Sequence, residues 1–463
     1  MINRFVSALA GAMLVVLAVV PAQAEVVFQD VTSDQGINAW LVEDYSVPLI
    51  TIRFSFTGGA SQDPAGKEGL ANLMTALFDE GAGDLDSDAF QIKLDDAGAE
   101  MSFSADLDSV YGAMRMLAER QDEGFSLLKS AIETPRFDQN PIDRMRSQIV
   151  SGIVASAQQP ETEANRQWSK TLYGDHPYAR PIEGTLETLP TITAADLHTF
   201  HDATFARSNL HIGVVGAIDA ETLKTRLDEL FGALPAEAAL TPVADILPQL
   251  GQDLAIAYDL PQTAIYMAYP GIKRDDPNYY AAYVMNFILG GGDFSSRLFA
   301  EVREKRGLTY GVSSSLQNID HSDSLIIGTS TRADRAAETL QVMQDVIAGL
   351  AKDGPTAEEL ASAKKYIIGS YAINSMSSSL AIAGTLVGLQ DTGRPIDYVA
   401  QRGDLIEAVT LEQVKAAAQQ LLTVKPTILQ LGPMAKPAAG APVAAPAPAP
   451  VEPPAPLAET VAP

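Results

Sequence analysis

The sequence of 463 residues contains no cysteine. The chain therefore has no disulfide bond, and its N-terminus cannot be lipidated on a cysteine. If such a chain is exported, its folding does not require oxidation of cysteines. With 46% hydrophobic and 19% charged residues, it has the composition of a globular protein long enough for two or three domains.

Positive charge is also scarce. The sequence has 32 lysines and arginines against 58 aspartates and glutamates, which gives a formal net charge of −26 at pH 7. No basic cluster could follow a phosphate backbone, so nucleic-acid binding is excluded as a function class. The acidic composition indicates a soluble, strongly hydrated surface.

Long apolar runs are absent except at the N-terminus. Arg4 precedes an apolar stretch from Leu14 to Val20, and an A-x-A cleavage pattern ends at Ala24. This arrangement is typical of a signal peptide over residues 1–24, with an uncleaved anchor as the alternative. We expect a mature chain without a stable membrane span, located in a bacterial periplasm, although the sequence does not separate this from full secretion.

Histidine is scarce as well, and no two of the five histidines are four residues apart. His198 and His201 lie three apart on a predicted helix whose start is marked by a Thr193-x-x-Asp196 capping pattern. No further ligand is evident nearby, so both are predicted to face solvent. The acidic segment 79–88 lacks the regular spacing of a calcium loop and is interpreted as a solvated loop.

Two halves of the chain repeat one order of predicted elements. A strand over 50–56, helices over 66–79 and 87–96, a strand over 107–116 and helices over 125–132 and beyond Pro141 form the first half. The second half has a strand over 265–269, helices over 279–289 and 295–306, strands over 310–316 and 324–330, and helices over 336–350 and 357–371. The repetition predicts an α+β fold with two similar domains in tandem.

Proline-rich segments set the expected boundaries. Residues 235–251 hold Pro235, Pro242 and Pro248 and are interpreted as a linker between a first domain over 25–234 and a second over 252–435. Residues 436–463 are rich in alanine and proline and nearly devoid of bulky apolar side chains. This tail is predicted to be disordered, and its role is open.

Several segments resemble the pitrilysin/insulinase family of zinc metallopeptidases over about residues 26–434. They are D-P-A-G-K-E-G-L-A at 63–71, H-P-Y at 176–178 with G-T at 184–185, N-L-H-I-G-V-V-G at 209–216, G-G-G-D-F-S-S-R-L-F at 290–299, E-V-R at 301–303 and G-L-T-Y at 307–310. The block over 290–310 is the most specific. The resemblance implies two insulinase-type domains, each a mostly antiparallel sheet covered by helices.

The family's zinc motif is missing. Active relatives place H-x-x-E-H directly after the Gly-Leu-Ala, where two histidines on one helix face bind zinc and the glutamate is the general base. Here these positions hold Asn72, Thr75 and Ala76. The third ligand, a glutamate of a later helix, is also missing, since residues 145–159 include no acid. We expect no catalytic residue and no metal in this chain.

The resemblance implies that a second part of the family's machinery is present. Family members hold the peptide with an arginine and, seven positions later, a tyrosine, and Arg303 and Tyr310 have this spacing. A guanidinium and a phenol could hold a substrate carbonyl or a developing oxyanion. A surface arginine with a half-buried strand tyrosine is the alternative that the chemistry alone leaves open.

Two neighbouring segments have weaker signals. The glycines at 290–292 lack the ending of a phosphate loop and are predicted to form a tight turn before a helix capped by Ser295. Residues 98–104 read as a short strand at the place where relatives expose a sheet edge to their substrate. An ordinary edge or hairpin strand is an equally good interpretation.

Together these features predict a zinc-free, substrate-binding subunit of a two-component periplasmic peptidase. A zinc-carrying partner with H-x-x-E-H would complete a heterodimer that cleaves unfolded peptides, and neither half would be competent alone. A non-proteolytic scaffold or binding protein is the alternative, and a self-sufficient enzyme with an unrecognised metal site is a third. The sequence does not identify the substrate, and it does not distinguish a homodimer from a heterodimer.

Overall fold

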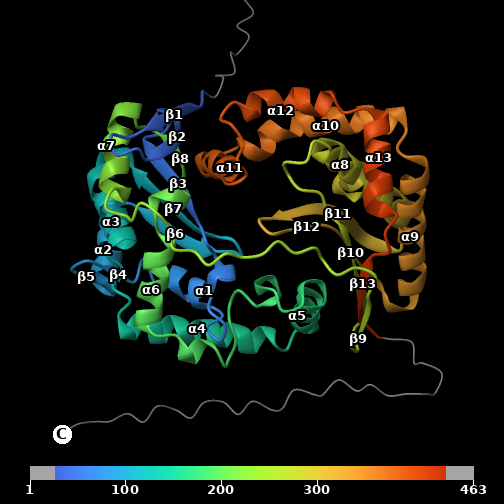
Figure 1. Ribbon diagram of the computed structural model, residues 1–463, viewed down its shortest axis with the longest axis horizontal. Helices are drawn as coiled ribbons and strands as arrows, with labels where there is room; N and C mark the ends of the chain where they lie inside the picture. The colour runs from blue at the N-terminus through green and yellow to red at the C-terminus, as the bar shows by residue number, and fades with distance from the viewer. Residues whose placement is uncertain (1–26, 434–463) are drawn as a thin grey trace, which may run out of the picture.

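The computed structural model describes residues 27–433, and the predicted signal peptide and Ala/Pro tail lie outside them. Two sheets, of six and five strands, face each other across the molecule and have the same topology except for one additional edge strand in the first (Figure 1). The first has the order β1-β2-β8-β3-β7-β6 and the second β11-β12-β10-β13-β9. The strands of the first are β1 (Gln29–Thr32), β2 (Asn38–Glu43), β3 (Leu49–Thr57), β6 (Glu100–Ala105), β7 (Ser109–Leu117) and β8 (Leu210–Gly216).

The second sheet repeats the pairing of the first. Its strands are β9 (Asp253–Ala257), β10 (Gln262–Pro270), β11 (Thr309–Ile319), β12 (Ser322–Arg332) and β13 (Thr427–Gly432). In each half one central strand pairs antiparallel with two neighbours, β3 with β7 and β8, and β10 with β12 and β13. Each half also has one parallel pair, β2 with β8 and β9 with β13. The predicted fold of two similar, mostly antiparallel α+β domains is therefore confirmed.

Helices cover one face of each sheet. In the first half these are α1 (Leu70–Thr75), α2 (Ser87–Ala97), α3 (Gln121–Glu133), α4 (Gln139–Ser156), α6 (Ala194–Thr204) and α7 (Ala220–Phe231), with a small ribbon of β4 (Gly81–Ala82) and β5 (Leu85–Asp86). In the second they are α8 (Tyr279–Asn286), α9 (Ala336–Asp353), α10 (Ala357–Ser375), α12 (Tyr398–Glu407) and α13 (Leu411–Leu422). Residues 235–252 form no helix or strand and join the halves.

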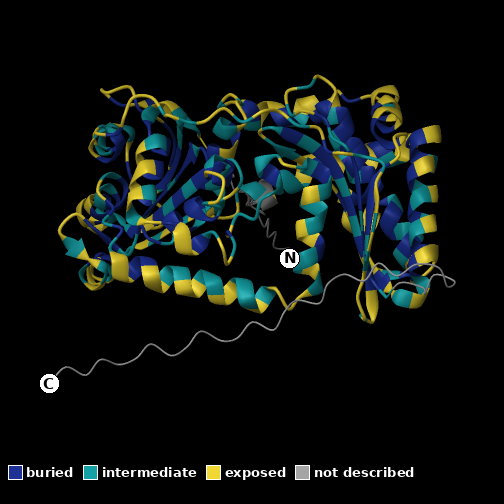
Figure 2. Cartoon of the chain, turned by 60° about the horizontal axis from the view of Figure 1, so that its bottom comes forward, coloured by how far each residue is buried: buried dark blue, intermediate teal, exposed yellow. Residues whose placement is uncertain are grey.

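Two hydrophobic cores result, and Figure 2 shows the buried residues gathered around each sheet. The alternating residues Ile50, Ile52, Phe54 and Phe56 of β3 are fully buried in the first core. Ile265, Met267 and Tyr269 of β10 occupy the equivalent place in the second. Inward-facing side chains therefore recur at every second residue along both strands.

One helix of each half packs against the sheet of the other half. Helix α11 (Ser379–Asp391) of the second half packs on β3 and β8, and Ala383, Leu386 and Leu389 join Trp40 and Val215 of the first sheet in one apolar cluster. Helix α5 (Pro160–Tyr173) of the first half packs on β13, where Ala164 and Trp168 meet Leu429 and Leu431. Both helices follow the long helix of their own half, so the exchange is reciprocal (Figure 1).

Polar contacts also join the halves. The Asp391 carboxylate at the end of α11 accepts hydrogen bonds from Ser55 Oγ at 2.6 Å and His211 Nδ1 at 2.7 Å. At the turn between β11 and β12, the Tyr178 hydroxyl accepts from His321 N at 3.0 Å and donates to Asp108 at 2.6 Å. The hydrogen bond from His321 N fixes the tip of the β11–β12 hairpin against the first half.

Three predicted helices differ from the structure. The helix expected over 66–79 is reduced to α1, because Gly66 and Gly69 have φ of 82° and 95° and residues 76–79 form turns. The helix expected over 279–289 ends as α8 at Asn286 and continues as the π-helical turn η6 (Phe287–Gly291). The helix expected from Ser295 starts after Ser296, whose hydroxyl accepts from Phe299 N, and widens into the π-helical η8 (Phe299–Glu304).

Candidate functional site

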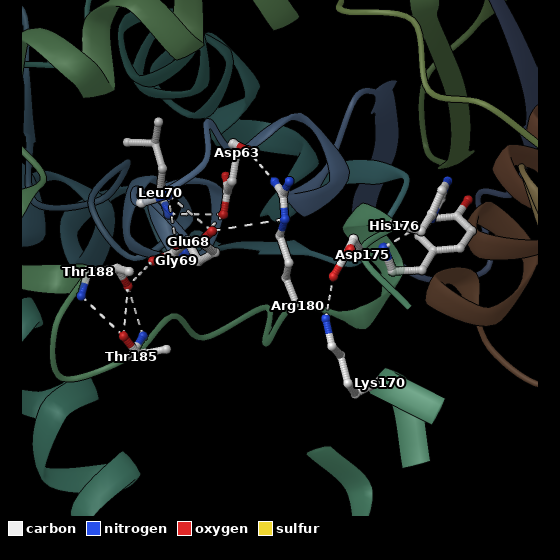
Figure 3. A network of polar contacts seen from close by, with 12 residues as sticks. Asp63, Glu68, Gly69, Leu70, Lys170, Asp175, His176, Arg180, Thr185 and Thr188 are labelled. Carbon is white, nitrogen blue, oxygen red and sulfur yellow. Dashed lines mark hydrogen bonds and ion pairs between the residues drawn. The ribbon is translucent and has the colours of Figure 1, made fainter. Parts of the chain in front are cut away.

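The helix that carries the zinc motif in active relatives is present as α1 and is well anchored. The buried Asp63 carboxylate accepts hydrogen bonds from the backbone N–H groups of Gly69, Leu70 and Ala71 at 2.8, 3.2 and 2.9 Å (Figure 3). Burial raises the pKa of Asp63 to about 7, against the lowering effect of these three donors. The start of α1 is thus held by a carboxylate in place of an N-cap side chain.

A second layer of contacts fixes the same segment (Figure 3). Arg180 Nη1 donates to the Asp63 carbonyl oxygen at 3.1 Å, and its Nε lies 3.9 Å from Glu68 Oε1. Thr188 Oγ1 donates to the Glu68 carbonyl oxygen at 2.7 Å. The backbone before α1 is therefore ordered even though α1 carries no metal ligand.

The residues at the family's zinc positions do not fit the ion. Asn72 and Ala76 are half-buried, and neither supplies an imidazole. Thr75 is 6% exposed, and its hydroxyl donates to the carbonyl oxygen of Asn72 at 2.9 Å. Within residues 27–433 no group of three or more His, Cys, Asp and Glu side chains is placed to hold a metal.

Arg303 and Tyr310 lie side by side. The Arg303 guanidinium carbon is 5.1 Å from the Tyr310 ring centroid, 4.6 Å from that of Phe299 and 5.5 Å from that of Phe294. In the part of the chain that the structure describes, no carboxylate lies within ion-pair distance of Arg303. The nearby Glu301 is bound instead by Lys305 and Arg306 at 2.6 Å each.

Phe294 and Phe299 belong to this site and were not identified from the sequence. Phe299 precedes Arg303 by four residues, which is the spacing of neighbours on one helical face, so the pattern could have revealed it. Phe294 lies on a short turn, and its ring stacks edge-on against Phe299 at 4.8 Å. We call Phe294, Phe299, Arg303 and Tyr310 the Arg/Tyr patch.

Two aromatic side chains of the patch are strongly exposed, whereas Phe299 is buried at 6% exposure. The alternative of a half-buried strand tyrosine is wrong, because Tyr310 is 90% exposed, and Phe294 is 71% exposed. Large aromatic side chains seldom remain in water without a partner, so such exposure is typical of a binding surface. Stacking against Arg303 covers the rings only in part.

A β-bulge determines where Tyr310 points. Thr309 pairs with Thr331 and Val312 with Thr329, so β11 has one extra residue between these pairs. The bulge is fixed by hydroxyl groups, since Thr309 Oγ1 accepts from Gly311 N at 3.1 Å and Thr329 Oγ1 donates to the Gly311 carbonyl at 2.8 Å. The Tyr310 backbone is therefore held in place at the outer edge of the second sheet.

The glycines before the patch allow the backbone of η6 to pack closely against β11. A Cβ on Gly290 would lie 2.7 Å from Ser314 Oγ and 2.8 Å from its backbone nitrogen, so η6 touches β11 there. The hydroxyl of Ser314 donates to Asn286 Oδ1 at 2.7 Å. The predicted tight turn follows at Asp293, which has φ of 44°, and Ser296 rather than Ser295 caps the next helix.

One histidine prediction is wrong. His198 is exposed, but His201 is only 5% exposed, and its Nε2 contacts the Ile132 carbonyl oxygen at 2.8 Å. Its ring packs on Phe205 at 4.6 Å and Phe78 at 6.2 Å. Burial lowers its pKa. His201 therefore belongs to the core, where its polar nitrogen has a partner.

The predicted edge strand is β6, which begins at Glu100 and pairs on one side only, with β7. The strand β11 occupies the equivalent edge of the second sheet and carries Tyr310. Both edges retain unpaired backbone groups within the described part of the chain. Such edges are able to accept an added peptide strand.

The comparisons with known proteins agree with this geometry. A family model described as insulinase (peptidase family M16) matches residues 40–186, and one described as the peptidase M16 inactive domain matches residues 191–367. A non-peptidase homologue, YmxG of Helicobacter pylori, is 23% identical over 80% of this chain and 86% of its own. An uncharacterized zinc protease of Mycobacterium leprae is 29% identical over 74% of this chain and 77% of its own.

Solved structures are also similar. The peptidase M16 inactive domain from Pseudomonas fluorescens has a TM-score of 0.81 and 32% identity, covering 88% of this chain and 98% of that one. The periplasmic protease PqqL from Escherichia coli has a TM-score of 0.73 and 18% identity, covering 89% of this chain and 47% of that one.

Among the residues described, no helix is long and apolar enough to cross a membrane. The chain is a member of the insulinase (M16) peptidase family, and it has the family's fold without the family's zinc-binding residues.

Proposed function

We propose that this chain is the non-catalytic, substrate-binding subunit of a two-component M16 peptidase. The observation that carries the proposal is the exposed Arg/Tyr patch in a chain whose α1 has no metal ligand. A guanidinium without a carboxylate partner, beside a phenol in water, is ready to hold a peptide carbonyl or a developing oxyanion. The zinc and the activated water would come from a partner chain with H-x-x-E-H.

The exposure of the patch supports a partner. Arg303 is held against three aromatic rings, and the bulge fixes Tyr310, so little reorganisation is needed on binding. The edge strand β6 offers a second place for an extended peptide, through main-chain hydrogen bonds that tolerate many sequences. An unfolded peptide is therefore the proposed substrate class.

The proposed location is the periplasm. The N-terminal pattern of residues 1–24 and the absence of cysteine suit an exported protein. A similar structure belongs to a protein described as a periplasmic protease. Cell fractionation followed by N-terminal sequencing tests the location, since a mature chain beginning at Glu25 supports it and a cytoplasmic full-length chain rejects it.

Reconstitution tests the function. The chain is purified from its native host under conditions that keep complexes together, and the co-purifying protein is identified and expressed separately. We expect peptide cleavage only when both chains are mixed, with zinc in the partner alone. Full activity of the partner without this chain would reject the proposal and leave a scaffold role. Stoichiometric zinc and turnover in this chain alone would indicate an enzyme with an unrecognised site.

A further inference from the structure

A cavity of about 250 Å³ lies among α8, α10 and α12, away from the Arg/Tyr patch. Half of the residues that line it are tyrosines, namely Tyr279, Tyr280, Tyr283, Tyr371 and Tyr398. Two arginines, Arg274 and Arg402, also line it, and no acidic residue does. A positively charged, aromatic cavity is unexpected in a chain with a net charge of −26.

Arg402 is the central cation of this cavity. The residue is 8% exposed, and its guanidinium carbon lies 4.2 Å from the Tyr371 ring centroid and 5.8 Å from that of Tyr283. Its hydrogen bonds go to neutral acceptors, the Ile367 carbonyl oxygen at 3.2 Å and the Tyr283 hydroxyl at 3.4 Å. Within residues 27–433 no carboxylate comes within 4.0 Å of it.

Arg274 adds a second guanidinium. Its Nη1 donates to the Tyr279 hydroxyl at 2.9 Å, and its carbon lies 5.1 Å from the same ring centroid. Arg394 lies behind it and donates to the Arg274 carbonyl oxygen. The Nε atoms of Arg274 and Arg394 are both buried without a hydrogen-bond partner in the described structure.

The tyrosines do not neutralise these charges. Burial raises the pKa of Tyr279, Tyr280 and Tyr371, so their hydroxyl groups stay protonated at neutral pH. Ring faces stabilise a guanidinium by less than the free energy that is lost when a charge leaves water unpaired. The aspartates nearest in sequence, Asp275 and Asp404, are exposed, and in the described part of the chain neither forms an ion pair with Arg274 or Arg402.

We propose that the cavity binds the oxyanion of a small molecule, a carboxylate or a phosphate, between Arg274 and Arg402. The planar forks of the two arginines match the oxygens of either group, and the tyrosine hydroxyls supply further donors. The volume restricts the ligand to a small molecule, and the aromatic walls favour a flat apolar body behind the charged group. This inference does not depend on the proposed peptidase role, because no residue of the Arg/Tyr patch lines the cavity.

Calorimetric titration of the full chain tests the site, with sodium benzoate and sodium phosphate as probes and sodium chloride of equal ionic strength as the reference. We expect saturable binding of one anion per chain. Binding of benzoate alone assigns the site to organic acids, and binding of phosphate alone assigns it to phosphates. No binding of either probe up to about ten millimolar overturns the proposal.

Variants separate ligand binding from structural roles. Arg402→Met should weaken binding at least about 30-fold and should leave thermal stability in chloride equal or higher, because an uncompensated buried charge is removed. Arg402→Lys, which keeps the charge without the fork, should weaken binding about tenfold. The matched control is Arg297→Met, since Arg297 already has a carboxylate partner in Glu359 at 2.7 Å. Loss of stability in Arg402→Met with unchanged anion affinity would overturn the assignment.

Discussion

Gly213 of β8 touches the carbonyl group of Ala383 on α11, and a Cβ on Gly213 would lie 2.6 Å from the Ala383 oxygen. The same Cβ would lie 2.9 Å from the Cβ of Leu386. A backbone oxygen at this distance cannot move aside as the end of a flexible side chain can. The approach of α11 to the first sheet therefore depends on a missing methyl group.

Gly213→Ala is the corresponding prediction. The added methyl should force α11 away from β8 and lower the free energy of unfolding by about 1–3 kcal/mol. Urea unfolding of the purified chain measures the loss. Gly349→Ala on α9 is the control, because a Cβ there meets nothing within 4 Å, and it should stabilise the helix by about 0.5–1 kcal/mol. Equal unfolding midpoints for Gly213→Ala and the wild type would show that α11 is not packed as described.

A second prediction concerns the hydroxyl of Tyr178, which is 2% exposed and joins Asp108 to His321 N. Tyr178→Phe leaves a carboxylate oxygen and a backbone N–H without partners, so we expect a loss of about 1.5–3 kcal/mol in unfolding free energy. Burial raises the pKa of Asp108 and this hydroxyl lowers it. Because the hydroxyl favours the charged carboxylate, the loss should be larger at pH 8 than at low pH.

The exposed Tyr45 provides the control for this change. Its hydroxyl donates to Glu43 at 3.2 Å on the surface, so Tyr45→Phe should change stability by less than about 0.5 kcal/mol. A loss in Tyr178→Phe that is the same at both pH values would exclude Asp108 as the group that responds.

Asp63 predicts a pH dependence of stability. Its folded pKa of about 7 lies above the value of about 3.9 in an unfolded chain, so the folded state binds more protons between these values. The contribution of Asp63 to the free energy of unfolding is therefore largest below about pH 4 and decreases as the pH rises to about 7. Above that pH it no longer changes. Asp63→Asn should remove this decrease. Between about pH 4 and pH 7, the free energy of unfolding of the variant should therefore rise relative to that of the wild type. Parallel profiles for the two proteins would contradict the prediction.

For the Arg/Tyr patch, we expect Tyr310→Phe to lower turnover of the reconstituted pair by about 10²–10³, or roughly 3–4 kcal/mol, because a transition-state donor is lost. Arg303→Lys keeps the charge but not the planar fork and should also impair turnover. Both variants should fold and bind the partner as the wild type does. Asn72→Ala is the control, since Asn72 occupies an unused ligand position and should change turnover little. Wild-type rates for both patch variants would show that this chain supplies no substrate contact.

The sequence predicts the features that are local. The strands expected over 50–56 and 265–269 lie within β3 and β10, and the Thr193-x-x-Asp196 pattern is a complete capping box at the start of α6. The spacing of Arg303 and Tyr310 brought them into contact because a helix end and the next strand are joined by only a short turn. In each case neighbouring residues determine the geometry.

Features that depend on residues distant in the sequence were not predicted. Thr51 and Ser55 alternate with the core residues of β3 and would be expected to face solvent, yet they are 1% and 0% exposed because α11 covers that face. His201 was misplaced for the same reason, since its partners Phe78 and Ile132 are distant in sequence. The bulge at Tyr310 depends on hydroxyl contacts between two strands, which the sequence of β11 alone does not reveal.

The reciprocal exchange of α5 and α11 bears on how such a chain arose. One half alone would leave a sheet face uncovered, and two identical copies could each cover the other by trading that helix, as in a domain-swapped dimer. The repeated topology is what fusion of such a dimer through residues 235–252 would give. A chain cut within that segment should therefore yield two fragments that remain associated, since each still holds the helix that completes its neighbour.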